Sequence, residues 1–230
     1  MKPHGVWFAT LLQPDHLCDR TYRRVLRWSG TIAASSLVTV LFLYAQPSMA
    51  APVVGEPAPD FVGTDSRGTS HALADFRGSP VVLEWTNHEC PYTVKHYQAG
   101  AMQALQQEAT GAGVVWFSIV SSAPGTQGHV TASEANTLTQ SRSAVPTAVI
   151  LDPEGAIGRL YDAKTTPHMF VIDATGQLVY MGAIDDQPSA RSDPASARNY
   201  VRLALSELAA GLPVTSASTQ PYGCTIKYLD

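Results

Sequence analysis

The stretch that decides the fold runs Val81-Val82-Leu83-Glu84-Trp85-Thr86-Asn87-His88-Glu89-Cys90-Pro91-Tyr92-Thr93. Residues 80–85 form a mostly apolar run with the length of a buried central strand. Proline is favoured in the first turn of a helix, so Pro91 predicts a helix over residues 91–111. A strand, a loop and a helix therefore follow one another, and Cys90 lies at the start of the helix.

That position makes Cys90 a candidate nucleophile. Unpaired backbone N–H groups and the helix dipole favour an anion there, and they can bring a cysteine pKa from about 8.5 into a range of roughly 3.5 to 7.5. Glu89 opposes ionisation and Lys95 favours it, and the sequence leaves open which effect is larger. The alternative interpretation is a buried, inert cysteine at the end of a strand.

The rest of the pattern predicts an α/β protein. Strands are expected over residues 60–64, 114–120, 145–151, 169–173 and 177–182. Helical segments are expected over residues 72–76, 134–141, 155–161 and 192–210. A β-α-β unit followed by a β-β-α unit predicts an α/β sandwich, with a central mixed β-sheet flanked by helices.

The first fifty residues have the order of a signal peptide. Four arginines precede an apolar run over residues 32–45, and Ser48-Met49-Ala50 supplies small residues for cleavage after Ala50. The run is shorter than the roughly 20 residues of a spanning helix, although an uncleaved anchor is the alternative. We therefore expect a signal peptide (1–50), a domain (51–212) and a C-terminal tail (213–230). The product is expected to be periplasmic or secreted, with membrane association only through an uncleaved leader.

Charge and cysteine content narrow the function further. From Ala51 onward the chain has 10 Lys and Arg against 17 Asp and Glu, a net charge of −7, and no dense basic run, which argues against nucleic acid as a partner. Three cysteines are too few for a disulfide scaffold or a four-cysteine zinc site. Removing the leader removes Cys18, so Cys90 and Cys224 can form one bridge. No cofactor is expected.

The active-site stretch resembles that of the thioredoxin superfamily, and within it the redoxin branch that contains the alkyl hydroperoxide reductase/thiol-specific antioxidant (AhpC/TSA) group. The resemblance extends over residues 51–212 and includes the entry segment 55–61, the segment 165–173 and the hairpin 173–182. It implies a thioredoxin-like fold in which Pro167 is cis and faces the cysteine, whereas an ordinary trans proline is the alternative. The substrate-binding residues are then expected to be Thr166 and Pro167, together with Trp85 and Pro91 beside the cysteine.

The same resemblance assigns roles to two further residues and reveals two departures. Glu84, six residues before Cys90, has the place of a buried acid that handles the proton of the second thiol; a solvent-facing or Arg-paired Glu84 is equally open. Thr93 is a catalytic candidate at the place of that second cysteine, so a local dithiol is impossible. Peroxiredoxins typically have Thr or Ser three residues before their cysteine and Pro seven before it, whereas this chain has Asn87 and Leu83.

These observations predict an exported thiol–disulfide oxidoreductase. Cys90 attacks a partner disulfide, and Cys224, in a tail expected to be mobile, or a partner thiol resolves the product, with an external reductant restoring the thiols. The first alternative is a thiol-dependent peroxidase that acts on a hydroperoxide. A metal-binding module and a redox-inactive interaction module are further alternatives. The metal alternative rests on His88, Cys90, His96 and His168, each of which can also be an exposed polar side chain.

Overall fold

The structure is a computed structural model that describes residues 51–229. The expected signal peptide, its cleavage point after Ala50 and Cys18 lie outside the described residues. None of the helices within residues 51–229 has the length and hydropathy of a membrane-spanning segment.

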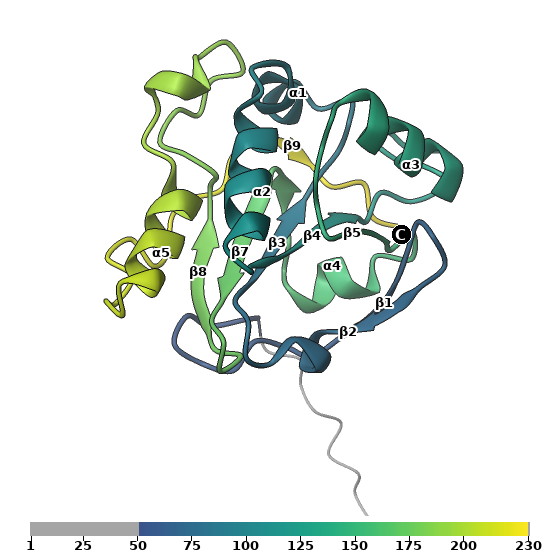
Figure 1. The fold of residues 1–230 in the computed structure, drawn as a ribbon. Helices are drawn as coiled ribbons and strands as arrows, with labels where there is room; N and C mark the ends of the chain where they lie inside the picture. The colour runs from purple at the N-terminus through teal and green to yellow at the C-terminus, as the bar shows by residue number, and fades with distance from the viewer. Residues whose placement is uncertain (1–50, 230) are drawn as a thin grey trace, which may run out of the picture. The chain divides into compact units, whose positions relative to one another are not determined.

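A mixed sheet forms the centre of the domain (Figure 1), with the strand order β2-β1-β5-β4-β3-β7-β8. Its strands are β1 (Val62–Asp65), β2 (Ser70–Ala72), β3 (Val81–Trp85), β4 (Val115–Val120), β5 (Ala148–Leu151), β7 (His168–Ile172) and β8 (Leu178–Gly182). The central strand β3 is parallel to β4 and antiparallel to β7, so Leu83 lies between Phe117 and Phe170. This arrangement confirms the predicted α/β sandwich with a mixed central sheet.

Helices cover both faces of the sheet. Successive side chains of a strand point to opposite faces, and every residue of β3 is buried, so neither face is open to solvent at this strand. The helices are α1 (Pro91–Gln98), α2 (Ala101–Gly111), α3 (Ala132–Ser141), α4 (Ala156–Leu160) and α5 (Tyr200–Ala209), with short 3₁₀ turns η1 (Leu73–Phe76) and η2 (Pro194–Ser196). On one face Val82 packs in a cluster with Leu105 of α2 and Val201 of α5. On the other face Leu83 belongs to a cluster with Ile157 of α4.

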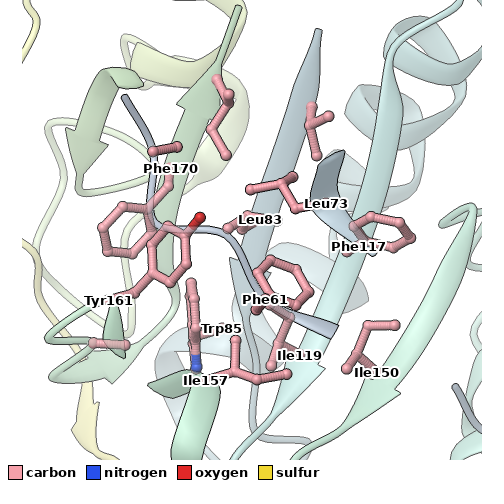
Figure 2. Packing of buried hydrophobic residues seen from close by; sticks show 14 of the residues in the cluster. Phe61, Leu73, Leu83, Trp85, Phe117, Ile119, Ile150, Ile157, Tyr161 and Phe170 are labelled. Atoms are coloured by element: carbon pink, nitrogen blue, oxygen red, sulfur yellow. The ribbon is translucent and has the colours of Figure 1, made fainter. Parts of the chain in front are cut away.

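Three aromatic side chains pack together at the end of β3 that leads into the loop bearing Cys90. Figure 2 shows Trp85, Tyr161 and Phe170 gathered side by side in the core. The Trp85 ring centroid lies 5.4 Å from that of Tyr161 and 5.1 Å from that of Phe170. The indole N–H of Trp85 donates to Ser121 Oγ at 3.0 Å. The loop that bears the cysteine therefore leaves from a rigidly packed strand.

Two predicted helices have wrong boundaries. The helix expected over residues 91–111 is divided into α1 and α2, because Gly100 adopts a left-handed conformation with φ +71° and starts a new helix. The helix expected over residues 192–210 begins only at Tyr200. There the side chain of Asn199 accepts a hydrogen bond from the backbone N–H of Arg202 at 2.8 Å and caps the helix.

The C-terminal tail is docked, so the expectation of a mobile tail is wrong. Its strand β9 (Cys224–Thr225) pairs antiparallel with β6 (Thr165–Thr166), the strand beside Pro167. Ile226 is buried in the core, and the hydroxyl of Tyr228 donates to the carbonyl of Ala163 at 2.7 Å. Figure 1 shows β9 close to the beginning of α1, which is where the cysteine lies. The tail thus forms part of the site.

Candidate active site

Cys90 is the N-cap residue of α1, and Pro91 follows it in the first turn, as predicted. The preceding loop is held in place at two points by other parts of the chain. The backbone N–H of Gly128 donates to the Glu89 carboxylate at 2.7 Å, and the guanidinium of Arg142 donates to the carbonyl of His88 at 3.1 Å. The loop therefore presents the thiol in a fixed position at the helix N-terminus.

The segment of Thr166 and Pro167 lies directly against the thiol. The peptide bond between these residues is cis, which confirms the conformation expected from the resemblance. The Cys90 thiol donates to the carbonyl oxygen of Thr166 at 3.1 Å. The carbonyl group just before the cis proline therefore lies at the reactive sulfur. The expected contact of Thr166 and Pro167 with a substrate stays a prediction.

The tail brings the second cysteine to the first. The backbone N–H of Cys224 donates to Cys90 Sγ at 3.3 Å, although the residues are 134 positions apart in sequence. Cys224 is also the register partner of Thr166, whose carbonyl accepts from Cys90. Both cysteines are free thiols in this structure. Two hydrogen bonds, one to each strand of the pair, thus join β6 and β9 to the Cys90 sulfur.

The surroundings give the two thiols different acidities. Burial raises the pKa of Cys90, but hydrogen bonding with Cys224, with the backbone of Thr93 and with the Thr166 side chain outweighs it, so that the net shift is downward. Burial and the neighbouring Cys90 raise the pKa of Cys224 to about 12. Neither Glu89 nor Lys95 contributes to the shift at Cys90. Cys90 is therefore the more acidic thiol of the pair, and Cys224 is the less acidic one.

Glu84 is fully buried, which excludes the solvent-facing and arginine-paired alternatives. Its carboxyl group accepts hydrogen bonds from Trp116 Nε1 at 2.9 Å, Ser118 Oγ at 2.9 Å, Tyr97 Oη at 2.9 Å and Gln106 Nε2 at 3.1 Å. Burial outweighs these bonds and raises the pKa of Glu84. None of the four partners is Cys90, so Glu84 ties α1, α2 and β4 to β3. Its expected role in proton handling stays a prediction.

Of the remaining predicted residues, Thr93 and Pro91 lie next to Cys90, whereas Trp85 lies in the core. Thr93 is buried and its backbone N–H helps to lower the pKa of Cys90. Its hydroxyl oxygen has no hydrogen-bond partner among the described residues. Pro91 is exposed beside the cysteine. Trp85 is 0% exposed and lies in the core, so the expected contact between Trp85 and a substrate is not supported.

Two of the three candidate histidines are buried rather than exposed. His96 and His168 are both buried, and burial lowers the pKa of each to about 4, so both are uncharged at neutral pH. His168 packs its ring against Phe170. Within residues 51–229 no three His, Cys, Asp or Glu side chains converge as metal ligands would. His88, Cys90, His96 and His168 thus do not form the set required by the metal-binding alternative.

A polar cluster around Tyr222, two residues before Cys224, was not predicted from the sequence. The hydroxyl of Tyr222 donates to Asp185 Oδ1, and His96 Nε2 lies 3.7 Å from Asp185 Oδ2. Lys95 Nζ lies 5.1 Å from the centre of the Tyr222 ring. The signal available in the sequence is the period-two spacing of residues 222, 224, 226 and 228, which is typical of a strand.

Two solved structures are similar to this chain in fold. A hypothetical protein from Sinorhizobium meliloti 1021 matches with a TM-score of 0.67 and 23% identity, covering 78% of this chain and 97% of that one. An uncharacterized conserved protein from Geobacillus kaustophilus matches with a TM-score of 0.66 and 25% identity, covering 77% and 93%. Each match covers more than three quarters of this chain, so the fold described above is shared with these two proteins.

Sequence comparison adds a relative and a family. The thiol-disulfide oxidoreductase ResA of Geobacillus kaustophilus (strain HTA426) is 26% identical over 132 residues, which cover 54% of this chain and 66% of ResA, slightly less than two thirds of its length. Residues 54–181, more than half of the chain, match the AhpC/TSA family. This range begins in the entry segment and includes Cys90, Thr166 and Pro167. The chain therefore belongs to the AhpC/TSA family.

Proposed function

We propose that the protein is a thiol–disulfide oxidoreductase whose redox centre is the pair Cys90 and Cys224. The observation that carries this proposal is the 3.3 Å distance from the backbone nitrogen of Cys224 to Cys90 Sγ. The opposite pKa shifts of the two thiols support it, because exchange begins with attack by a thiolate and the downward shift makes Cys90 the more acidic thiol. The similarity to ResA, which is named a thiol-disulfide oxidoreductase, supports the same reaction.

The first step is attack by Cys90. The Cys90 thiolate donates its electron pair to one sulfur of a partner disulfide, and a bond forms between the two sulfurs. The partner's own S–S bond breaks, and its second sulfur leaves as a thiolate that takes a proton from solvent. The backbone N–H groups of Thr93 and Cys224 stabilise the attacking thiolate before this step.

The second step is resolution by Cys224. After losing its proton, Cys224 attacks the sulfur of Cys90, the mixed disulfide breaks, and the partner's first sulfur is released as a thiol. The partner has then gained two electrons, and the protein holds a Cys90–Cys224 disulfide. An external thiol reductant restores the two free thiols. Cys224, in the tail, thus takes the role of the second cysteine, whose usual position in α1 is occupied by Thr93.

The other site residues position the two cysteines and the partner chain. Thr166 contacts the reacting sulfur, Thr166 and Pro167 would contact the partner chain there, and Pro91 is exposed next to Cys90. Glu84 is a positioning residue, since its hydrogen bonds hold α1 and α2 against the sheet. The leader pattern supports a location outside the cytoplasm, in an oxidising compartment where protein disulfides persist as partners.

The test is the reaction of the reduced full-length protein with a small aromatic disulfide, followed by absorbance of the released thiol. In the full-length Cys18→Ser parent, whose remaining thiols are Cys90 and Cys224, the reaction should release two thiols per protein and end with Cys90 and Cys224 linked. Cys224→Ser should release one thiol and retain a mixed disulfide at Cys90, detected as added mass. Cys90→Ser in the same parent should release none at the parent's rate, and wild type is run beside the parent to measure what Cys18 adds. Equal reaction of wild type and Cys90→Ser would refute the proposal.

Peroxide reduction would use the same two cysteines. A parallel measurement with hydrogen peroxide distinguishes it from thiol–disulfide exchange. A peroxidase would oxidise Cys90 to a sulfenic acid, which Cys224 would convert to the disulfide with loss of water. Asn87, at the place of the expected Thr or Ser, is buried and its side-chain oxygen accepts from the Glu89 N–H at 2.8 Å. We therefore expect faster oxidation of the protein by the disulfide than by hydrogen peroxide at equal concentration.

A further inference from the structure

The space in front of Cys90 is filled by the chain's own tail. Cys90 is 0% exposed. Cys224 lies against its sulfur, while the strand of Cys224 and Thr225 is paired with Thr165 and Thr166. Two cysteines cannot occupy one place beside the same sulfur. A partner cysteine that reaches Cys90 must therefore take the place of Cys224, and the free backbone edge of Thr165–Thr166 is then available for strand addition.

The tail also fills a polar subsite two residues before Cys224. The hydroxyl of Tyr222 donates to Asp185 Oδ1 and lies 3.4 Å from His96 Nε2. The Tyr222 ring lies beside that of Tyr92, with 5.8 Å between centroids, and below Lys95 Nζ. The side chains of His96 and Asp185 are each 1% exposed, and Asp185 Oδ2 has no hydrogen-bond partner among the described residues. Without the tail, a buried carboxylate would be left without its hydroxyl donor.

The residue between Tyr222 and Cys224 is restricted in size. Gly223 has φ +132°, and a Cβ atom built there would lie 2.0 Å from the carbonyl oxygen of Thr166. That oxygen belongs to the backbone and accepts from the Cys90 thiol, so it cannot move without disturbing the site. A chain in this groove therefore needs glycine immediately before its cysteine.

We propose that the tail is an internal mimic of the partner, and that its groove binds an extended polypeptide segment of the form Tyr-Gly-Cys. This inference rests on the proposed function and specifies its substrate. Asp185 and His96 are the specificity-determining residues for the tyrosine hydroxyl. The paired edge of Thr166 orients the partner's cysteine toward Cys90, and the tail leaves the groove when the partner enters.

The test uses peptides with the sequence of residues 219–227, Thr-Gln-Pro-Tyr-Gly-Cys-Thr-Ile-Lys, whose cysteine is joined by a disulfide to thionitrobenzoate. The protein is the full chain with Cys18→Ser and Cys224→Ser, so that Cys90 is the only thiol. The Cys90 thiolate attacks the peptide sulfur, the mixed disulfide forms, and thionitrobenzoate leaves with the electron pair and is measured by its colour. Two further peptides carry Phe in place of Tyr, or Ala in place of Gly.

The readout is the ratio of second-order rate constants between peptides. The need to displace the tail lowers the rate constant of every peptide by the same factor. This factor therefore cancels in the ratio of two rate constants. A buried hydrogen bond to a carboxylate predicts that the Tyr peptide reacts at least about tenfold faster than the Phe peptide. The Ala peptide should also react at least about tenfold more slowly than the Gly peptide, because its Cβ meets backbone.

Three protein variants locate the effect. Asp185→Asn should lower the Tyr-to-Phe ratio at least about threefold, because a neutral acceptor binds a hydroxyl more weakly than a carboxylate. Tyr222→Phe should loosen the tail, raise the rates of all peptides and leave the ratio unchanged. Asp186→Asn is the matched control at an exposed neighbouring carboxylate and should change neither.

The outcomes separate this inference from the function on which it rests. Reaction with the small disulfide cystamine, together with a Tyr-to-Phe ratio near one in the unaltered site, would overturn the inference and leave the oxidoreductase proposal intact. No reaction of Cys90 with cystamine or with any peptide would instead remove the proposed function. The peptide ratio is measured without altering the groove, so it does not depend on the folding of any groove variant.

Discussion

Replacement of Glu84 tests how the buried carboxyl group supports the site. Glu84→Met keeps the length of the side chain but removes the acceptor. The Trp116 N–H cannot turn to another acceptor, and leaving it unpaired in the core costs about 1 to 3 kcal/mol. The lost bonds from Ser118 and Tyr97 each cost about 1 kcal/mol more. Glu84→Met should thus lower the free energy of unfolding by about 3 to 5 kcal/mol, a large part of the typical 5 to 15 kcal/mol.

Glu84→Gln separates the charge from the acceptor. The glutamine oxygen can still accept from Trp116 and Ser118, so we expect a loss of only about 1 to 2 kcal/mol at neutral pH. Burial raises the pKa of Glu84 from 4.5 in the folded protein, so the unfolded chain releases this proton first. The free energy of unfolding of wild type therefore falls as pH rises above 4.5 toward the folded pKa. The advantage of wild type over Glu84→Gln should shrink across that interval.

The assay is urea unfolding followed by tryptophan fluorescence, at several pH values between about 4 and 7. Both variants are compared with wild type at the same pH, so other titrating groups cancel to first order. A free energy of unfolding for Glu84→Met within about 1 kcal/mol of wild type would refute the hydrogen-bond argument. An advantage of wild type over Glu84→Gln that grows with pH would refute the assigned direction of the pKa shift.

Other predictions concern the cysteine, the tail and the leader. Alkylation of Cys90 should rise with a midpoint below pH 9.0, and a midpoint above it would contradict the downward pKa shift. Gly223→Ala should raise the alkylation rate at a fixed pH by forcing the tail away from Thr166, whereas Gly211→Ala, also at positive φ but with open space around its Cβ, should not. N-terminal sequencing of the exported protein should begin at or near Ala51, and an intact Met1 on a membrane-bound product would contradict cleavage.

The features predicted correctly from the sequence depend on local patterns. The apolar run of β3 and the proline after Cys90 each define an element within a few residues, and their order places the thiol at a helix N-terminus. The cis conformation of Pro167 was expected from the family resemblance, because no local rule selects it. The break at Gly100 was missed because the helical pattern continues on both sides, and one glycine is tolerated inside many helices.

The features missed in the site depend on contacts between distant residues. Tyr222 meets Asp185 and His96 from 37 and 126 positions away, and no spacing rule connects them. The tail resembles a linker because its first part, residues 215–219, consists mostly of Ser and Thr, but it docks because Ile226 and Tyr228 pack against the apolar core of the domain. The alternative of an exposed side chain is wrong for His96 and His168, because composition does not indicate which polar side chains the fold encloses.

The most direct test of the central claim is the connectivity of the cysteines in protein isolated from its own compartment without reductant. Peptide mapping of the oxidised form should yield one peptide pair linked through Cys90 and Cys224, and the pair should separate with a mild thiol reductant. The linkage should reappear after one turnover of a disulfide substrate. A free Cys224 in protein whose Cys90 is oxidised would contradict the claim that these two residues form the redox centre.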